Sequence, residues 1–135
     1  MRIIRSILAP VDFSEPSRSA LDFALQLARR FDASLTILHV YEAPSGTDEH
    51  ERVGQAARDA VEGLRTELSR ADVLVQAVAA VGSPADQILD WARAHGFDLI
   101  VMGTHGRRGL GHLVLGSVAE HVVRSAPCPV VTLRG

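Results

Sequence analysis

A chain of 135 residues and 14.5 kDa is long enough to bury one hydrophobic core and short for two, so we expect a single domain over residues 1–135. Its formal net charge of −2 disfavours binding to nucleic acid or to an anionic membrane surface. No window approaches the ~18 consecutive apolar residues that a membrane span requires, and the first apolar stretch is too short for a signal peptide. We therefore expect a cytoplasmic protein without nucleic-acid or membrane partners.

Short apolar segments alternate with amphipathic ones in the first half of the chain. Residues 3–11 are predicted to form a strand. Ser14 is a suitable N-cap for the helix that follows, and Pro16 falls in its first turn, where a missing N–H is tolerated. Apolar residues then recur at helical spacing, at Leu21, Ala24, Leu25 and Ala28. Residues 34–40 are predicted to form a second strand, and the polar residues 42–52 a loop.

The second half continues the alternation. A helical stripe runs through Val53, Ala57, Val61, Leu64 and Leu68. Residues 73–81 then predict a strand, and Ser83 followed by Pro84 predicts the start of a helix. Residues 98–102 are predicted to form a fourth strand, and the apolar run 99–102 within it suits a strand covered on both faces. A helix over 117–124 and a strand over 129–133 complete the chain. The order βαβαβαβαβ predicts an α/β fold, a mainly parallel sheet with helices on both faces.

The stretch between the fourth strand and the last helix is unusually rich in glycine. Five glycines fall within its 14 positions, where average usage of about 7% would give roughly one: Gly103, Gly106, Gly109, Gly111 and Gly116. Glycine allows backbone N–H groups to converge on an anion, and the helix that follows adds the positive end of its dipole. Arg107, Arg108 and the Ser117 hydroxyl are further candidates for phosphate contacts, and Ser117 is also a candidate cap for the last helix. A phosphate site is favoured over a flexible connector.

Three other α/β binding classes fail on their own residues. A receiver domain would use Asp12 as phosphoacceptor but needs a late lysine, and all 14 basic residues here are arginine. A flavin mononucleotide site needs a glycine-bearing loop after the first strand, and the segment that follows Asp12 has none. In a dinucleotide fingerprint beginning at Gly109, Val114 would stand where the third glycine falls. These classes are therefore disfavoured.

We expect the histidines and the cysteine to have structural roles rather than catalytic or metal-binding ones. His39 lies inside a predicted strand and is expected to be a half-buried polar residue on one face of the sheet. His105 and His112 are seven residues apart on a loop, which is not a metal-ligand spacing. Cys128 is the sole cysteine, stands between two prolines, and is expected to pack as a small side chain. We assign no metal site and no catalytic residue.

The spacing of the glycines resembles the ATP-binding signature of the universal stress protein family. Gly103 and Gly106 are separated by two residues, and Gly106 is followed after nine residues by Gly116-Ser117. Residues 7–14 (ILAPVDFS) are similar to the family's first strand and acidic turn, residues 98–106 to its fourth strand and loop, and residues 125–131 to the approach to its last strand. The resemblance extends over the whole chain.

The resemblance implies a fold, a ligand and a set of contacts. The fold is a three-layer α/β/α sandwich of the adenine nucleotide alpha hydrolase-like type, with five parallel strands in the order 3-2-1-4-5. The ligand is ATP, with or without Mg²⁺. Asp12 and Val40 would contact adenine, and Met102 and Gly103 would line the ribose and phosphate entrance. Further residues implied in binding are Pro10, Val11, Gly106, Arg107, Gly116, Ser117 and Val118.

Three functions remain open. The favoured one is an ATP-binding protein of stress response or regulation that forms a homodimer through Val130–Leu133, an uncharged β-branched strand that resembles the family's dimer edge. A dimeric interaction module that binds no nucleotide is an alternative, but its relatives tend to lose the spaced glycines. A slow ATPase is another alternative. Ser117 or Ser14 with Asp12 could contribute to a Mg²⁺ site, but no dedicated base is evident, so little or no hydrolysis is expected.

Overall fold

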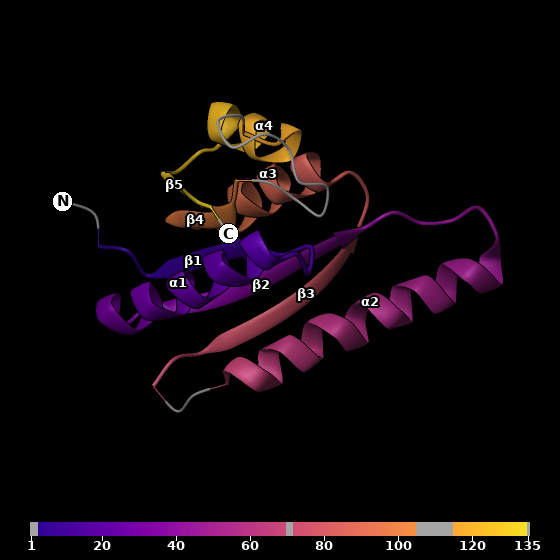
Figure 1. The fold of residues 1–135 in the computed structure, drawn as a ribbon, viewed down its shortest axis with the longest axis horizontal. Coiled ribbons are helices and arrows are strands. Elements are labelled where there is room, and N and C mark those ends of the chain that lie inside the picture. Colours follow the sequence, from indigo (N-terminus) through magenta and orange to yellow (C-terminus); the bar gives the residue numbers. More distant parts are fainter. Residues whose placement is uncertain (1–2, 70–71, 105–114, 135) are drawn as a thin grey trace.

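Five parallel strands form one sheet, and helices cover both of its faces (Figure 1). The computed structural model describes residues 3–69, 72–104 and 115–134. The strands are β1 (Ser6–Pro10), β2 (Ser34–Tyr41), β3 (Val75–Val81), β4 (Leu99–Gly103) and β5 (Val130–Leu133), and the helices are α1 (Glu15–Phe31), α2 (Thr47–Leu68), α3 (Pro84–His95) and α4 (Ser117–Ser125). The sheet order is β3-β2-β1-β4-β5, which confirms the predicted α/β class and the order implied by the resemblance.

The central strand carries the densest part of the interior. Ile7, Leu8 and Ala9 of β1 are completely buried, because helices cover the sheet on both sides. Alternate residues pack into two separate cores: Ile7 belongs to the core beneath α1 and α2, and Leu8 to the core beneath α3 and α4. The two cores hold the sheet rigidly, so the residues at the ends of its strands have fixed positions.

Local signals at the helix ends fix where the chain leaves the sheet. The Ser14 hydroxyl accepts a hydrogen bond from the Ser17 N–H and caps α1 as predicted. Ser83 is the N-cap residue of α3, as predicted, but its side chain makes no capping bond. At α4 the prediction was wrong: Gly116 is the N-cap and Ser117 is the first helical residue. This shift of one residue leaves the Ser117 side chain exposed to the space in front of the helix.

Predicted boundaries differ at other elements too, most of all at the starts of α2 and β1. Residues 42–52 are not a loop throughout, because α2 begins at Thr47 after the N-cap Gly46. Asp48 and Glu49 in its first turn interact favourably with the helix dipole, but these residues face solvent and so carry no apolar periodicity. The first strand begins at Ser6 rather than at residue 3, and its start is held by the Asp98 carboxylate, which accepts from the N–H groups of Arg5 and Ser6.

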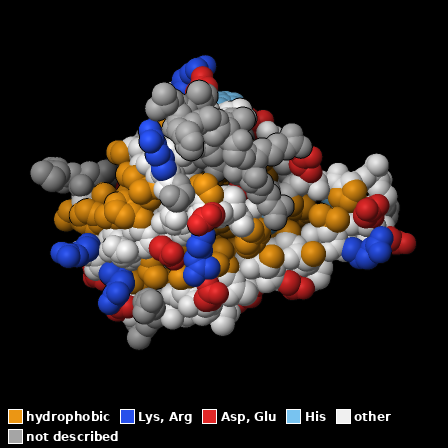
Figure 2. All heavy atoms as spheres, in the orientation of Figure 1, with side chains coloured by type: hydrophobic (Ala, Val, Ile, Leu, Met, Phe, Trp, Pro, Cys, Tyr) orange, Lys and Arg blue, Asp and Glu red, His pale blue; other side chains and the backbone are white. Residues whose placement is uncertain are grey.

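The outer surface of the first helical layer carries mixed charge. Figure 2 shows basic and acidic side chains next to one another on this face. Arg18 pairs with Asp22 on α1 and with Glu67 on α2, so it links the two helices. Within the described residues, none of the helices combines the length and the apolar character that crossing a bilayer would need.

Candidate functional site

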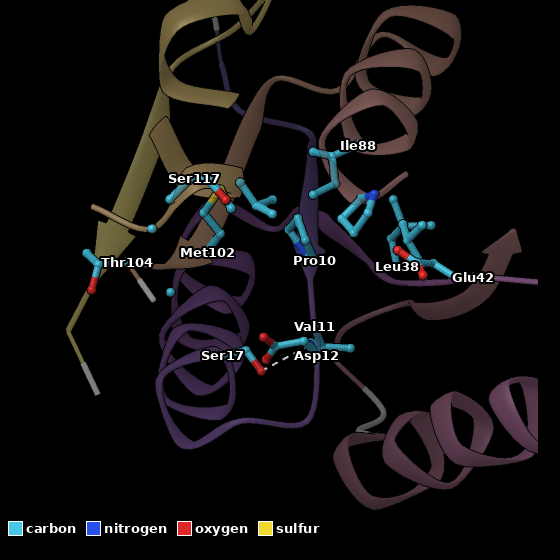
Figure 3. Close-up of a pocket in the computed structure, with 16 residues that line it drawn as sticks. Pro10, Val11, Asp12, Ser17, Leu38, Glu42, Ile88, Met102, Thr104 and Ser117 are labelled. Atoms are coloured by element: carbon cyan, nitrogen blue, oxygen red, sulfur yellow. Dashed lines mark hydrogen bonds between the residues drawn. The ribbon is translucent and has the colours of Figure 1, made fainter. Parts of the chain in front are cut away.

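The carboxyl ends of β1, β2 and β4 meet at one edge of the sheet, and a cavity of about 570 Å³ opens there (Figure 3). The chain direction explains its position. The chain runs outward from β1 to β2 and β3, then crosses back through α3 to β4 on the other side of β1 and ends at β5. The strand order therefore reverses beside β1, and open α/β sheets bind ligands in the crevice at such a reversal, outside the carboxyl ends of the strands.

Nine of the eleven predicted binding residues line this cavity: Pro10, Val11, Asp12, Val40, Met102, Gly103, Gly116, Ser117 and Val118. They lie in or next to four elements, β1, β2, β4 and α4, which are far apart in the chain. The other two, Gly106 and Arg107, lie outside the described residues. The cavity also includes residues that the motif analysis did not single out, namely Ser17, Leu38, Glu42, Pro84, Ile88, Thr104 and Ala119.

A compact hydrogen-bond network holds Asp12 at the start of α1. The Asp12 Oδ1 accepts from the Ser14 N–H at 3.0 Å and from the Ser14 hydroxyl at 2.5 Å. The Asp12 N–H donates to the Ser17 hydroxyl oxygen at 3.3 Å, drawn as the dashed line in Figure 3, and that hydroxyl donates to the Ser14 carbonyl. Among the described residues, Oδ2 of Asp12 accepts no hydrogen bond, so it remains available to a donor in the cavity.

The end of β2 presents backbone groups to the same space. The Val11 N–H donates to the Leu38 carbonyl at 2.8 Å, so the N–H and C=O of Leu38 face β1. Backbone groups alternate sides along a strand, so those of Val40 face the same way, beyond Pro10, where β1 has ended. The Tyr41 carbonyl instead accepts from the Gly82 N–H on the β3 side, as this alternation requires. Val40 therefore directs one donor and one acceptor into the crevice.

Backbone contacts fix the other side of the cavity. The Gly116 N–H donates to the Thr104 carbonyl at 2.7 Å, and the Thr104 N–H donates to the Leu133 carbonyl at 2.8 Å. These bonds join the end of β4, the start of α4 and the end of β5. Thr104 itself is buried. The N-terminus of α4 is therefore held at a fixed position, with Ser117 and Val118 at its first turn lining the cavity.

The walls are mainly apolar, with polar groups at two sides. Leu38 from β2 and Ile88 from α3 add to the apolar surface, and Figure 3 shows Ile88 on the opposite side from Asp12 and Ser17. Glu42 follows β2 and adds a second carboxylate to that of Asp12. Among the described lining residues there is no positive side chain, so an anion here would rely on backbone N–H groups and hydroxyls. An apolar slot with a few directed polar groups suits a small organic ligand.

Among the lining residues that sequence reasoning missed, some carried no signal and one carried a usable signal. Leu38 and Ile88 are apolar side chains on a strand and a helix, and nothing in the pattern distinguishes them from ordinary core residues. Glu42 carried a usable signal, because a charged residue two positions after a predicted strand lies near the edge where ligands bind. The described residues contain no group of three or more side chains able to hold a metal ion.

Comparisons with known proteins agree with this architecture. Residues 4–134 match the model of the universal stress protein family. Universal stress protein YxiE of Bacillus subtilis is 31% identical, over 98% of this chain and 100% of that protein. Universal stress protein UspA from Lactobacillus plantarum superposes with a TM-score of 0.86 at 27% identity, covering 99% of this chain and 100% of that one. A universal stress protein in complex with cAMP superposes with a TM-score of 0.69 at 25% identity, covering 98% of each chain.

Proposed function

The chain belongs to the universal stress protein family, and on that premise we propose that it binds an adenine nucleotide, ATP in the first place, in the cavity at the carboxyl edge of its sheet. We propose further that it acts as a homodimer in stress response or regulation in the cytoplasm, as a single domain, with little or no ATP hydrolysis. The observation that carries the proposal is the convergence of the nine motif residues on one cavity.

The base end of the ligand belongs beside Val40. Adenine presents an amino donor next to a ring-nitrogen acceptor on its Watson–Crick edge, which matches the C=O and N–H that Val40 directs into the crevice. A 6-oxo purine presents the opposite pair and would set like groups against each other. The apolar surfaces of Val11, Leu38 and Ile88 suit the faces of a purine.

The phosphate end belongs at the N-terminus of α4. Backbone N–H groups of its first turn have no partner within the helix, and the helix dipole favours negative charge there. Ser117 and Val118 supply N–H groups of that turn, whereas the Gly116 N–H is bonded to the Thr104 carbonyl and Gly116 contributes space without a side chain. Gly106 and Arg107 are proposed to complete the anion site. With Asp12 and Glu42 at other parts of the wall, a phosphate is repelled from the base end, which gives the ligand one orientation. The relative solved with cAMP supports an adenine nucleotide as the ligand class.

The proposed dimer uses the outer edge of β5. The Leu133 and Pro129 carbonyls accept from β4-side N–H groups, so by alternation the N–H groups of Val130 and Thr132 face away from β4. All four β5 residues are half-buried and none is charged, so the edge offers backbone pairing to a second copy without repulsion.

Isothermal titration calorimetry with ATP, with and without Mg²⁺, tests the proposal. Saturable heat with ATP and weaker binding of inosine triphosphate is the expected result, since only the adenine edge matches Val40. Parallel titrations with ADP, AMP and cAMP rank the phosphate requirement. A phosphate-release assay on the saturated protein measures hydrolysis. No heat signal at high micromolar ATP would contradict nucleotide binding.

A further inference from the structure

The His39 side chain makes a contact with Val11 at the point where β1 separates from β2. Regular parallel pairing beyond the Val11 N–H to Leu38 carbonyl bond would next join the Val40 N–H to the Val11 carbonyl. The structure departs from this pattern. The Val11 carbonyl oxygen lies 3.0 Å from Nδ1 of His39, and no backbone bond joins Val40 to Val11 among the described residues. The imidazole of His39 therefore contacts the Val11 carbonyl oxygen, which in a regular ladder would accept from the Val40 N–H.

The contact defines the protonation of the ring. A carbonyl oxygen can only accept a hydrogen bond, so Nδ1 of His39 carries a proton. This is so in the neutral Nδ1–H tautomer and in the charged ring, and it is untrue only of the neutral Nε2–H tautomer. Phe13 holds the ring in place from outside, since its ring centroid lies 4.7 Å from that of His39 in an edge-to-face arrangement at 67°.

We propose that His39 is a positioning residue for the nucleotide site: by donating its Nδ1–H to the Val11 carbonyl it keeps the Val40 N–H available to the purine base. The inference rests on the proposed function, since it assigns a role within the same site. His39 lies half-buried beside the cavity rather than in its lining, so it acts through Val40 and Val11 and does not touch the ligand.

The same bond orients Asp12. In a trans peptide the C=O and N–H point in opposite directions. The peptide between Val11 and Asp12 is held at both ends, its oxygen by His39 and its N–H by the Ser17 hydroxyl. A peptide fixed in this way sets the direction in which the Asp12 side chain leaves the backbone. One imidazole therefore supports both polar features of the base end.

Three substitutions separate the donor from the bulk of the side chain. His39→Asn keeps an N–H donor at the position of Nδ1. His39→Asp introduces a side chain of nearly the same size as asparagine, but it offers only acceptors at neutral pH. His39→Leu removes polar groups altogether and serves if the aspartate variant folds poorly. We expect His39→Asn to bind ATP within about threefold of wild type, and His39→Asp and His39→Leu to bind about tenfold or more weakly.

The ratio of the affinities for ATP and inosine triphosphate is a specific readout. A general destabilisation of the site would weaken the binding of both nucleotides and leave this ratio unchanged. Without the donor, the Val11 carbonyl is free to pair with Val40, so the affinity ratio should fall toward one in the aspartate and leucine variants and stay near wild type in the asparagine variant. Unchanged ratios and affinities in the aspartate and leucine variants would overturn the proposal, as would equal losses in the asparagine and aspartate variants.

Two measurements without nucleotide distinguish this inference from the binding proposal. Nitrogen NMR of the His39 ring in the free protein should show a protonated Nδ1, and hydrogen exchange of the Val40 amide should slow in His39→Leu as that amide joins the ladder. If wild type bound no ATP, the proposed function would fail, and these measurements would still decide whether His39 controls the Val40 amide. An unprotonated Nδ1, or Val40 exchange that is the same in both proteins, overturns the inference.

Discussion

The backbone of Pro16 occupies the space that a side chain on Gly103 would need. A Cβ built on Gly103 would lie 2.9 Å from the Pro16 carbonyl carbon and 3.0 Å from the Pro16 Cβ. Gly103, the first of the spaced glycines, therefore serves the close approach of α1 to the end of β4. We expect Gly103→Ala to lower the free energy of unfolding by about 1–3 kcal/mol, because rigid backbone must move to admit the methyl group.

A matched substitution elsewhere isolates that effect. Gly63 lies within α2, and a Cβ there would meet no atom within 4 Å. Gly63→Ala should raise the free energy of unfolding by about 0.5–1 kcal/mol, since alanine has the better helix propensity. Urea denaturation of both variants gives the comparison. Equal effects of the two substitutions would show that the contact with Pro16 is not a tight one.

Substitution of Gly116 tests the placement of the phosphates. Gly116 is buried at the start of α4 and lines the cavity, so the valine side chain of Gly116→Val would fill space proposed for phosphate. We expect ATP binding to become undetectable, a loss of about 100-fold or more, while the protein stays folded. Gly46→Val is the control, because Gly46 is also an N-cap and a Cβ there would meet only the Glu49 Cβ at 4.0 Å. Normal ATP affinity in Gly116→Val would show that the phosphates bind elsewhere.

The Asp12 side chain offers a test of the open carboxylate oxygen. In Asp12→Asn the amide oxygen can still accept from Ser14, but an NH₂ group replaces Oδ2. If the ligand donates to Oδ2, ATP affinity should fall by about tenfold to 100-fold, the amount associated with one hydrogen bond to a charged acceptor. Asp22→Asn on the exposed face of α1 changes the net charge equally and should leave affinity unchanged. Equal affinity in Asp12→Asn and wild type would remove Asp12 from the contact set.

Backbone pairing at the outer edge of β5 can be blocked without disturbing the pairing of β5 with β4. Thr132→Pro removes one N–H that faces away from β4, so the fold should survive while pairing with a second chain is lost. We expect wild type and Thr132→Val to have twice the 14.5 kDa chain mass in light scattering after size-exclusion chromatography, and Thr132→Pro to have the single-chain mass. A dimeric Thr132→Pro variant would exclude this edge as the interface.

Sequence patterns predicted the elements well because their signals are local. The Ser14 cap, the apolar spacing from Leu21 to Ala28 and the uninterrupted strand before Gly103 each depend on residues within a few positions. The start of α2 was missed because its first turns carry no apolar stripe. Residues 48–52 are exposed, so they need no apolar side chains to form the helix. The strand order came from the resemblance, since local periodicity carries no information on which strands are neighbours.

The residues of the candidate site also divide into those with a signal in the sequence and those that depend on how the strands pair. The spaced glycines were identified from their order along the chain, and the binding role of Asp12 came from the resemblance. The role of His39 could not be, because it depends on β1 ending at Pro10 while β2 continues to Tyr41. The mismatch between two strand ends is a property of their pairing. His39 was expected only to be half-buried and polar on one face of the sheet, and the structure confirms that environment.

The bond from the Thr104 N–H to the Leu133 carbonyl also has a consequence for biosynthesis. A chain emerging from the ribosome can form β1, α1 and β2 early, since N-terminal elements become available first. The entrance to the crevice beside α4 lacks its final support until Leu133 has been added and β5 has docked on β4. Chains terminated before Leu133 would therefore present an unfinished crevice, and the proposed ligand could be held only after β5 has been synthesised and has docked.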